Sequence, residues 1–359
     1  MEPADITIPF LTTVIGSLPK PAYLYGSTAF SSSGRDLLGE GASSALRGKG
    51  LKDAQDDAVK VAVHDQELAG IDIISDGEQR RESYVTYLLR RLVGFDYQDL
   101  GEKWVRGGRR LGKVGRCTGP ISWNNPILVE DLGFALTQTK RSVKVTLPGP
   151  MTVVDSTLDE YYGDEIAMAR AVAGVLNKEA RALDDAGATV IQFDEPVFSR
   201  YPEKVLDWGI EMLDLAAEGI SASTAVHICY SYPLPGVPRP IVPSYPTILP
   251  ALEESSIGQI SLEFEEPGLD PKLLELCPSK TIIFGCISNA TESIETPEHV
   301  SERLLDAARY HPPHMLQAAP DCGLVPLSKH SSQAKLISLV EGAKLARKRL
   351  TGTEIQEST

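Results

Sequence analysis

Short apolar runs rich in β-branched residues recur along the chain, separated by longer segments of mixed polarity. Runs of this length that end at turn residues are typical of buried β-strands. We count eight such runs and interpret each as a strand. They cover residues 12–17, 71–78, 143–150, 189–196, 224–231, 259–264, 281–288 and 315–323.

The segments between these runs carry apolar residues three and four positions apart, mixed with charges, which predicts amphipathic helices. One connection, residues 270–277, is short. Eight strands joined by helices most economically close into an α/β fold of the (β/α)8 TIM-type barrel class, whose chemistry lies at the carboxyl ends of the strands. The predicted helices are 52–69, 81–93, 164–186, 203–218, 246–255, 297–310 and 331–349.

Two insertions interrupt the repeating pattern. A Gly/Ser-rich stretch at about 18–50 predicts an extended loop after the first strand, with short helical pieces. Residues 94–140 contain the sequence KWVRGGRRLGKVGRC and predict a hairpin or arm between the second and third strands. We expect residues 1–350 to form one barrel domain that carries both insertions, and 351–359 to be a polar tail.

Charge and hydropathy narrow the class of protein. The chain has 359 residues, 42% of them hydrophobic, and a net charge of −14. That composition fits a large globular enzyme, and the negative field opposes nucleic acid and anionic membranes. No apolar run approaches the roughly 18 residues that span a bilayer, and the N-terminus lacks a basic region leading into an apolar signal core. We therefore predict a cytoplasmic enzyme acting on small molecules.

The five cysteines are odd in number and widely spaced, which argues against a disulfide framework. Reduced cysteines are usually small buried hydrophobes, and this is our interpretation of Cys117, Cys277 and Cys286. The other two, Cys229 and Cys322, stand at strand ends close to other candidate metal ligands.

His227 and Cys229 are two positions apart on one strand, so both side chains face the same side. Alone this pair is weak evidence for a metal, but Glu263 and Cys322 end two further strands that converge at the same end of a barrel. Two thiolates, an imidazole and a carboxylate match Zn²⁺. The wide spacing favours a catalytic over a structural zinc, with Glu263 as the exchangeable ligand. A catalytic zinc here would activate a thiol for alkylation.

Five motifs carry a resemblance to a known family. Taken in order, they resemble the signatures of the catalytic domain of cobalamin-independent methionine synthases, and the resemblance runs from about residue 10 to 345. It implies a TIM-type barrel, a zinc site and transfer of a methyl group to the sulfur of homocysteine. The motifs are VIGS (14–17), DGE (76–78), DEP (194–196), HICYS (227–231) and PDCG (320–323).

Carried over by position, the resemblance assigns two groups of site residues. Ser17 and the backbone near Ile15 and Gly16 would hold the homocysteine carboxylate, and Glu78 and Asp194 would hold its ammonium group. As ordinary residues, Ser17 would be a turn hydroxyl, Glu78 a solvated loop acid and Asp194 a capping or bridging acid. The zinc ligands that the resemblance implies are His227, Cys229, Glu263 and Cys322.

The sequence departs from the family pattern on the side of the methyl donor. The classical enzymes of the family have two barrels, and we expect this chain to have the catalytic one only. Ser156 stands where the family has a tryptophan that stacks on the folate pteridine, and residues 288–293 lack the proton-relay histidine. The methyl donor therefore stays open between a methylated folate, a corrinoid and another small donor.

Two alternatives to methyl transfer also stay open. One is the same zinc chemistry on another acceptor, such as an epoxide opened by a thiol in the manner of a coenzyme M transferase, and the other is a non-catalytic thiol- or zinc-binding relative. The basic residues of segment 103–116 could meet an anionic donor, a donor-delivery protein or a second subunit of a homodimer, or could form a solvated hairpin face. They are Lys103, Arg106, Arg109, Arg110, Lys113 and Arg116.

Overall fold

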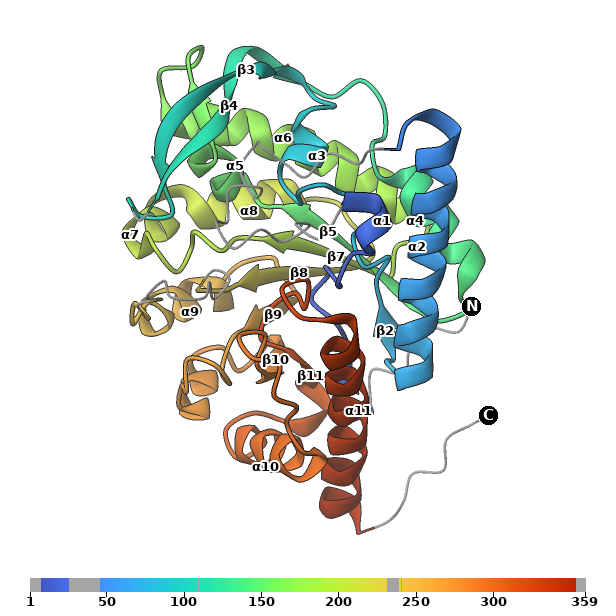
Figure 1. Ribbon diagram of the computed structural model, residues 1–359. Coiled ribbons are helices and arrows are strands. Elements are labelled where there is room, and N and C mark those ends of the chain that lie inside the picture. Colours follow the sequence, from blue (N-terminus) through green and yellow to red (C-terminus); the bar gives the residue numbers. More distant parts are fainter. Residues whose placement is uncertain (1–7, 26–45, 109, 231–238, 240, 353–359) are drawn as a thin grey trace.

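Eight parallel strands form a barrel in the computed structural model, which describes residues 8–25, 46–108, 110–230, 239 and 241–352 (Figure 1). The strand order is β1-β11-β10-β9-β8-β7-β5-β2, and a parallel bridge between Thr13 and Ile73 joins the first strand to the last. Each strand overlaps one of the eight predicted runs, although β1 shares only Thr12 with its run. The strands are β1 Leu11–Thr12, β2 Ile73–Ile74, β5 Ser142–Pro148, β7 Val190–Asp194, β8 Ser223–Ile228, β9 Gln259–Leu262, β10 Thr281–Ile287 and β11 Leu316–Pro320.

Alternation along each strand divides its side chains between two environments. On β8, Val226 and Ile228 pack in the large core between barrel and helices, whereas Ala225 belongs to a small cluster inside the barrel. The period of two then turns His227 and Cys229 toward the barrel interior at the end of the strand. The predicted α/β barrel is confirmed, and its strand ends aim the candidate ligands at one point.

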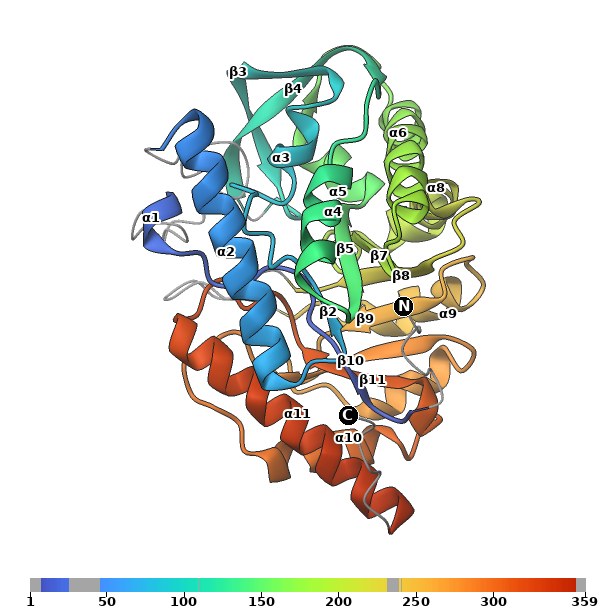
Figure 2. The ribbon, with the colours of Figure 1, turned by 90° about the vertical axis from the view of Figure 1, so that its right-hand side faces the viewer.

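A ring of helices surrounds the barrel, with α2 and α11 packed side by side (Figure 2). No helix in the described ranges is both long and apolar enough to cross a membrane. The main helices are α2 Gly48–Ala69, α4 Val129–Gln138, α6 Glu165–Asp185, α8 Ile210–Ala217, α9 Tyr245–Glu253, α10 Pro297–Ala307 and α11 Lys329–Thr351. Shorter pieces are α1 Ala22–Tyr25, α3 Thr86–Leu89, α5 Pro150–Asp155, α7 Pro202–Lys204, a π-helical turn Val205–Gly209, and 3-10 turns Pro271–Leu276 and Pro313–Met315.

The predicted helix over 81–93 is wrong in extent, because only α3 within it is helical. The apolar spacing there has another cause: Val85, Leu89 and Leu92 are buried against the core from turns and a short helix. The helix that covers the barrel between β2 and β5 is α4, which contacts α2 and β5. It lies inside the segment 94–140 that we had assigned wholly to the arm.

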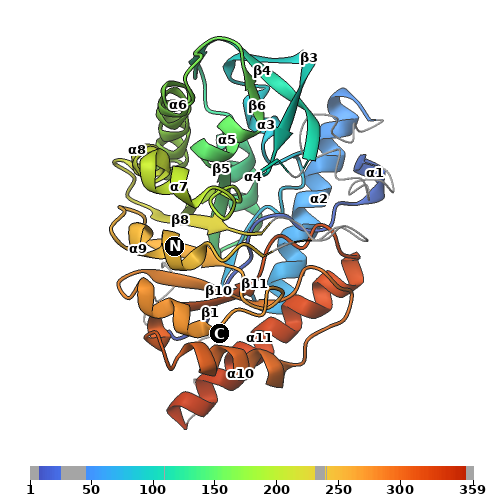
Figure 3. The same ribbon diagram turned by 90° about the vertical axis from the view of Figure 1, so that its left-hand side faces the viewer.

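The predicted arm is a two-stranded hairpin of β3 (Val93–Val105) and β4 (Arg110–Ser122), extended by β6 (Thr157–Asp159) into a three-stranded sheet (Figure 3). Its turn begins at Arg106, which has a φ of 56°. Of the other predicted insertion, about 18–50, residues 26–45 lie outside the described part of the chain, as does the end of the predicted polar tail.

Candidate metal and substrate site

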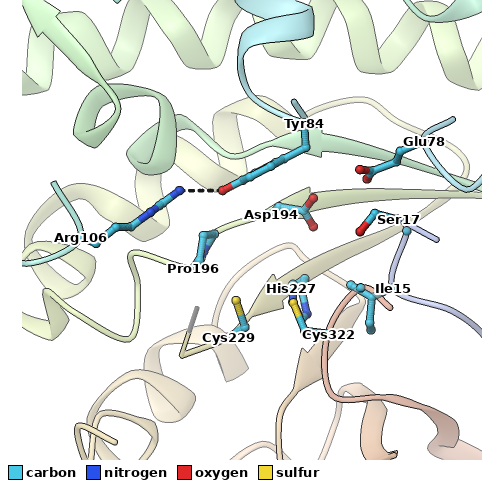
Figure 4. Close-up of a pocket in the computed structure, with 12 residues that line it drawn as sticks. Ile15, Ser17, Glu78, Tyr84, Arg106, Asp194, Pro196, His227, Cys229 and Cys322 are labelled. Carbon is cyan, nitrogen blue, oxygen red and sulfur yellow. Dashed lines mark hydrogen bonds between the residues drawn. The ribbon is translucent and has the colours of Figure 1, made fainter. Parts of the chain in front are cut away.

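One pocket opens at the carboxyl ends of the barrel strands and collects eight of the nine predicted site residues (Figure 4). The empty space between its walls is about 540 Å³, open solvent at the mouth included. The lining also contains four residues that the sequence had not assigned to the site. The predicted residues in the lining are Ile15, Gly16, Ser17, Glu78, Asp194, His227, Cys229 and Cys322, and the additional ones are Tyr84, Arg106, Pro196 and Gly323.

Three of the predicted metal ligands lie together at the bottom of the pocket. One potential ligand atom each of His227, Cys229 and Cys322 lies within 4.8 Å of the other two, and all three residues are buried. The His227 Nδ1 atom lies 2.9 Å from the Ser261 hydroxyl, and its Nε2 atom is buried without a hydrogen-bond partner in the described structure. A metal-binding histidine commonly donates its other ring N–H to such a partner. The orphaned nitrogen beside two sulfurs therefore fits a zinc ion.

Glu263, the fourth predicted ligand, is fully buried, but it is not part of this three-residue cluster. Its carboxylate accepts hydrogen bonds from Arg239 Nη1 at 3.0 Å and from the Tyr230 N–H at 3.2 Å. Burial raises the pKa of Glu263 well above its usual range, nearby Cys229 adds to the rise, and Arg239 opposes it. Its role as a zinc ligand stays a prediction. In the structure, the carboxylate pairs with Arg239.

Asp321 is a structural residue that the sequence did not single out within the PDCG motif. Its carboxylate accepts the backbone N–H groups of residues 264–266, at 2.9, 3.0 and 2.6 Å. These bonds tie the end of β9, which carries Glu263, to the end of β11, which carries Cys322. The distance between Glu263 and Cys322 thus depends on Asp321, the residue before Cys322.

Two carboxylates face the pocket beside the metal cluster. Glu78 Oε1 accepts a hydrogen bond from the Thr146 hydroxyl at 2.7 Å, and Asp194 Oδ1 accepts one from Gln192 Nε2 at 2.8 Å. Burial raises the pKa of Asp194 to about 7. Glu78 has a φ of 53°, a conformation that costs of order 1–3 kcal/mol for such a residue. A strained acid held at a pocket wall is consistent with a binding role.

The loop after β1 is held from inside the barrel. The carbonyl oxygens of residues 14–16 accept hydrogen bonds from Lys144 at 2.9 Å, Gln192 at 2.9 Å and Ser75 at 2.8 Å. In a trans peptide the N–H points away from the carbonyl, so the inward carbonyls turn the next N–H groups toward the pocket. A Cβ on Gly16 would lie 2.7 Å from Glu78 Oε1. A larger residue at position 16 would therefore displace the Glu78 carboxylate, whereas glycine leaves it in place.

Arg106 reaches the pocket from the tip of the arm, opposite Ser17 and Glu78 (Figure 4). Its Nη2 donates to the Tyr84 hydroxyl at 2.7 Å. The sequence named Arg106 only as one member of a basic cluster, and it did not indicate Tyr84. The sequence shows that the hairpin turn carries an arginine. It does not show where the turn packs, because contacts with residues distant in the sequence determine that position.

The other members of that basic cluster have structural contacts of their own. Lys103 donates to the carbonyls of Val154 and Thr157 at 2.7 and 2.8 Å, and Arg116 pairs with Glu160 at 3.2 Å. Arg109 and the side chain of Arg110 lie outside the described structure. All five cysteines are buried, and none of them forms a disulfide in the described structure.

These features define a (β/α)8-barrel enzyme with its site at the carboxyl ends of the strands. The family model described as the catalytic domain of cobalamin-independent synthase matches residues 10–345. A methionine synthase of Sulfurisphaera tokodaii is 31% identical over 340 residues, which cover 94% of this chain and 93% of that protein. A methionine synthase of Sulfolobus acidocaldarius is 32% identical over 347 residues, with 96% and 94% covered.

A solved structure agrees with these sequence relatives. The B12-independent methionine synthase from Shewanella sp. W3-18-1, in complex with selenomethionine, has a TM-score of 0.89 and 36% identity, covering 96% of this chain and 100% of that chain. The chain belongs to the cobalamin-independent methionine synthase family. The resemblance stated from the motifs and the predicted enzyme class, a methyltransferase, are confirmed.

Proposed function

We propose that this enzyme transfers a methyl group to the thiol of homocysteine at a zinc ion held by His227, Cys229 and Cys322, with Glu263 as the exchangeable fourth ligand. Its family membership and its methionine synthase relatives support methyl transfer to homocysteine. The single observation that carries the zinc site is the buried, unpartnered Nε2 of His227 facing two thiols. When bound, zinc lowers the pKa of a thiol and leaves the thiolate nucleophilic.

The chain's own residues would orient the amino acid. The loop at residues 15–17 would receive the carboxylate through N–H groups that face the pocket and a hydroxyl, and Glu78 and Asp194 would bind the ammonium group. Both functions match the charges of these groups. The sulfur then lies over the cysteines, where it attacks the methyl carbon in line with the departing group.

Opening of an epoxide by a sulfonated thiol is the alternative that uses the same metal chemistry. A sulfonated thiol has no amino group for these two buried carboxylates to bind, and its negative charge would lie beside theirs; Arg81 Nη1, 3.9 Å from Glu78 Oε1, offsets only one of them. Both acids line the pocket in the structure. This arrangement favours an amino-acid thiol over the alternative.

The test is zinc analysis of the purified full chain, followed by mass spectrometry of the thiol product. We expect about one zinc per chain, lost in Cys322→Ser. Homocysteine would be offered with methyltetrahydrofolate, methylcobalamin or an epoxide, and methionine is the expected product with one of the methyl donors. A zinc content far below one that Cys322→Ser does not change would refute the metal site, and an alkylated thiol formed only from the epoxide would refute methyl transfer.

We further propose that residues 1–350 act as one catalytic domain and that the small-molecule partners are homocysteine and a methyl donor of the folate, corrinoid or another class. The match over residues 10–345 supports a single catalytic unit. Analytical ultracentrifugation distinguishes a homodimer from a monomer that needs a separate donor-delivery protein.

A further inference from the structure

The pocket has two walls of different charge. Glu78, Asp194 and Ser17 lie on one side, Arg106 lies across the cavity from Ser17 and Glu78, and Tyr84 lies between them with its hydroxyl directed at Arg106 (Figure 4). An amino-acid thiol that spans from the first wall to Cys229 leaves the second wall to the other reactant. We refer to Arg106 and Tyr84 as the arm-tip pair.

The arm-tip pair has hydrogen-bonding capacity left over. The Nη1 atom of Arg106 is buried and has no hydrogen-bond partner within the described structure, and its nearest acid, Asp155, lies 3.9 Å away. The Tyr84 hydroxyl accepts from Arg106, so its own proton can be donated elsewhere. Burial raises the pKa of Tyr84, which keeps the hydroxyl protonated. A buried guanidinium without full partners is costly unless a ligand satisfies it.

The arm-tip pair is also held in place. The Arg106 N–H donates to Asp155 Oδ2 at 3.0 Å, and the Gly107 N–H donates to the Tyr201 hydroxyl at 2.8 Å. Tyr201 in turn donates to Asp155 Oδ1 at 3.2 Å. Arg106 keeps a φ of 56°, a conformation that persists only where the surroundings enforce it. Such preorganisation is expected of a binding site.

We propose that the arm-tip pair binds an anionic oxygen, a carboxylate or a phosphate, on the leaving-group side of the methyl donor. This inference rests on the proposed function. In the transfer, a sulfur lone pair forms the S–CH3 bond and the bond from the methyl carbon to the leaving atom breaks, with its electron pair going to the leaving group. Arg106 holds the anionic oxygen through its spare N–H, and Tyr84 donates a second hydrogen bond.

The test uses methyl iodide as a neutral donor, so that it does not depend on the natural one. Methionine formation by the zinc-loaded full chain with homocysteine would be measured with increasing sodium phosphate or sodium acetate at constant ionic strength. Both anions should inhibit the wild type by occupying the arm-tip site, and the tighter of the two gives the class of the donor's anion. In Arg106→Met the inhibition constant should rise by about tenfold or more, as expected for loss of a charged hydrogen bond.

Matched variants separate the site from the fold. Lys113→Met removes an exposed charge on the same arm and should leave inhibition unchanged, whereas Tyr84→Phe should weaken it by a few fold. Arg106→Lys keeps the positive charge but lacks the planar guanidinium group. We therefore expect inhibition between that of Arg106→Met and that of wild type. Homocysteine binding, followed by calorimetry, should stay within twofold of wild type in all four variants.

Two failures have different meanings. If wild type and Lys113→Met form no methionine beyond the enzyme-free rate from methyl iodide, methyltetrahydrofolate or methylcobalamin, the proposed function is wrong. If they form it but the anions do not inhibit, or inhibit Arg106→Met as strongly as wild type, the arm-tip inference is overturned while the proposed function stands. Loss of homocysteine binding in Arg106→Met would also overturn it, because Arg106 would then serve the thiol substrate.

Discussion

The residues on one side of the pocket come from the barrel strands and the turns directly after them, whereas Arg106 on the other side comes from an inserted hairpin. Asp194 and His227 are neighbours in register on β7 and β8, so the barrel itself fixes their separation. Arg106 is positioned by Asp155, which lies 49 residues further along the chain. The barrel fold determines where the residues of the first side lie. The packing of an inserted hairpin determines where Arg106 lies.

This difference predicts which substrate each side of the pocket controls. A residue on a barrel strand cannot move without disturbing the sheet, because its neighbours on both sides are hydrogen-bonded. A hairpin tip can change length and charge with little cost to the barrel. We therefore expect substitutions of barrel residues to affect the thiol, and those around the arm tip to affect the methyl donor alone.

The largest effect is expected at the metal cluster, which both reactants must approach. Cys322→Ser replaces a soft sulfur with a hydroxyl, and should reduce methyl transfer by roughly 10³-fold, since catalytic metals supply several kcal/mol. Zinc content and turnover would be measured on the same preparation. Cys286→Ser is the control, because Cys286 is equally buried but lies outside the metal cluster, and full loss of zinc there would contradict the assignment.

The next effect isolates the thiol side. Asp194→Asn removes one charge from the ammonium site, and the KM for homocysteine should rise by about 10–100-fold, as for loss of a charged hydrogen bond. The control substrate is 4-mercaptobutanoate, which lacks the amino group and should be used equally well by both enzymes. An equal loss with both thiols would show that Asp194 acts on the pocket's structure instead of on the ammonium group.

A smaller effect is expected from loosening the arm. Asp155→Asn weakens the hold on the Arg106 N–H, and should lower kcat/KM for the methyl donor by about fivefold, the value of one hydrogen bond. The KM for homocysteine should not change. The matched control is Glu160→Gln, an acid that pairs with Arg116 on the same arm at 39% exposure. A rise in the homocysteine KM in Asp155→Asn would break the separation between the two sides.

The two sides also differ in how far the sequence predicts them. All eight strands, the arm and eight lining residues follow from apolar runs and motifs, because strand ends meet at one edge of a barrel whatever the loops do. Tyr84 could not be found this way, since its segment was predicted to be helical and its apolar spacing arises from turns that pack on the core.

Glu263 shows the limit for a single ligand. Its position at the end of a strand was predicted correctly, but its carboxylate pairs with Arg239, a residue that belongs to no motif. The docking of Arg106 likewise depends on Asp155 and Tyr201, two side chains that carry no motif. Polar contacts between residues distant in the sequence leave no periodic pattern, so the sequence does not predict them.

The smallest effect should leave both sides of the pocket untouched. His311 is buried, and its Nε2 lies 2.9 Å from the Lys280 carbonyl. Burial lowers the pKa of His311 below its usual range, so the unfolded chain binds the proton more tightly than the folded one. Its stabilising contribution is therefore present above the ordinary histidine pKa and is lost as pH falls through the lower folded value.

In His311→Gln the amide can still donate to Lys280, but the titrating group is gone. Thermal melting between pH 7.5 and 5 should therefore show a shallower loss of stability than in wild type, with His314→Gln as the control at a neighbouring exposed histidine. The KM values for both substrates should stay as in wild type at neutral pH. A change in either would mean that the barrel frame is coupled to the pocket, and that the two sides are not independent.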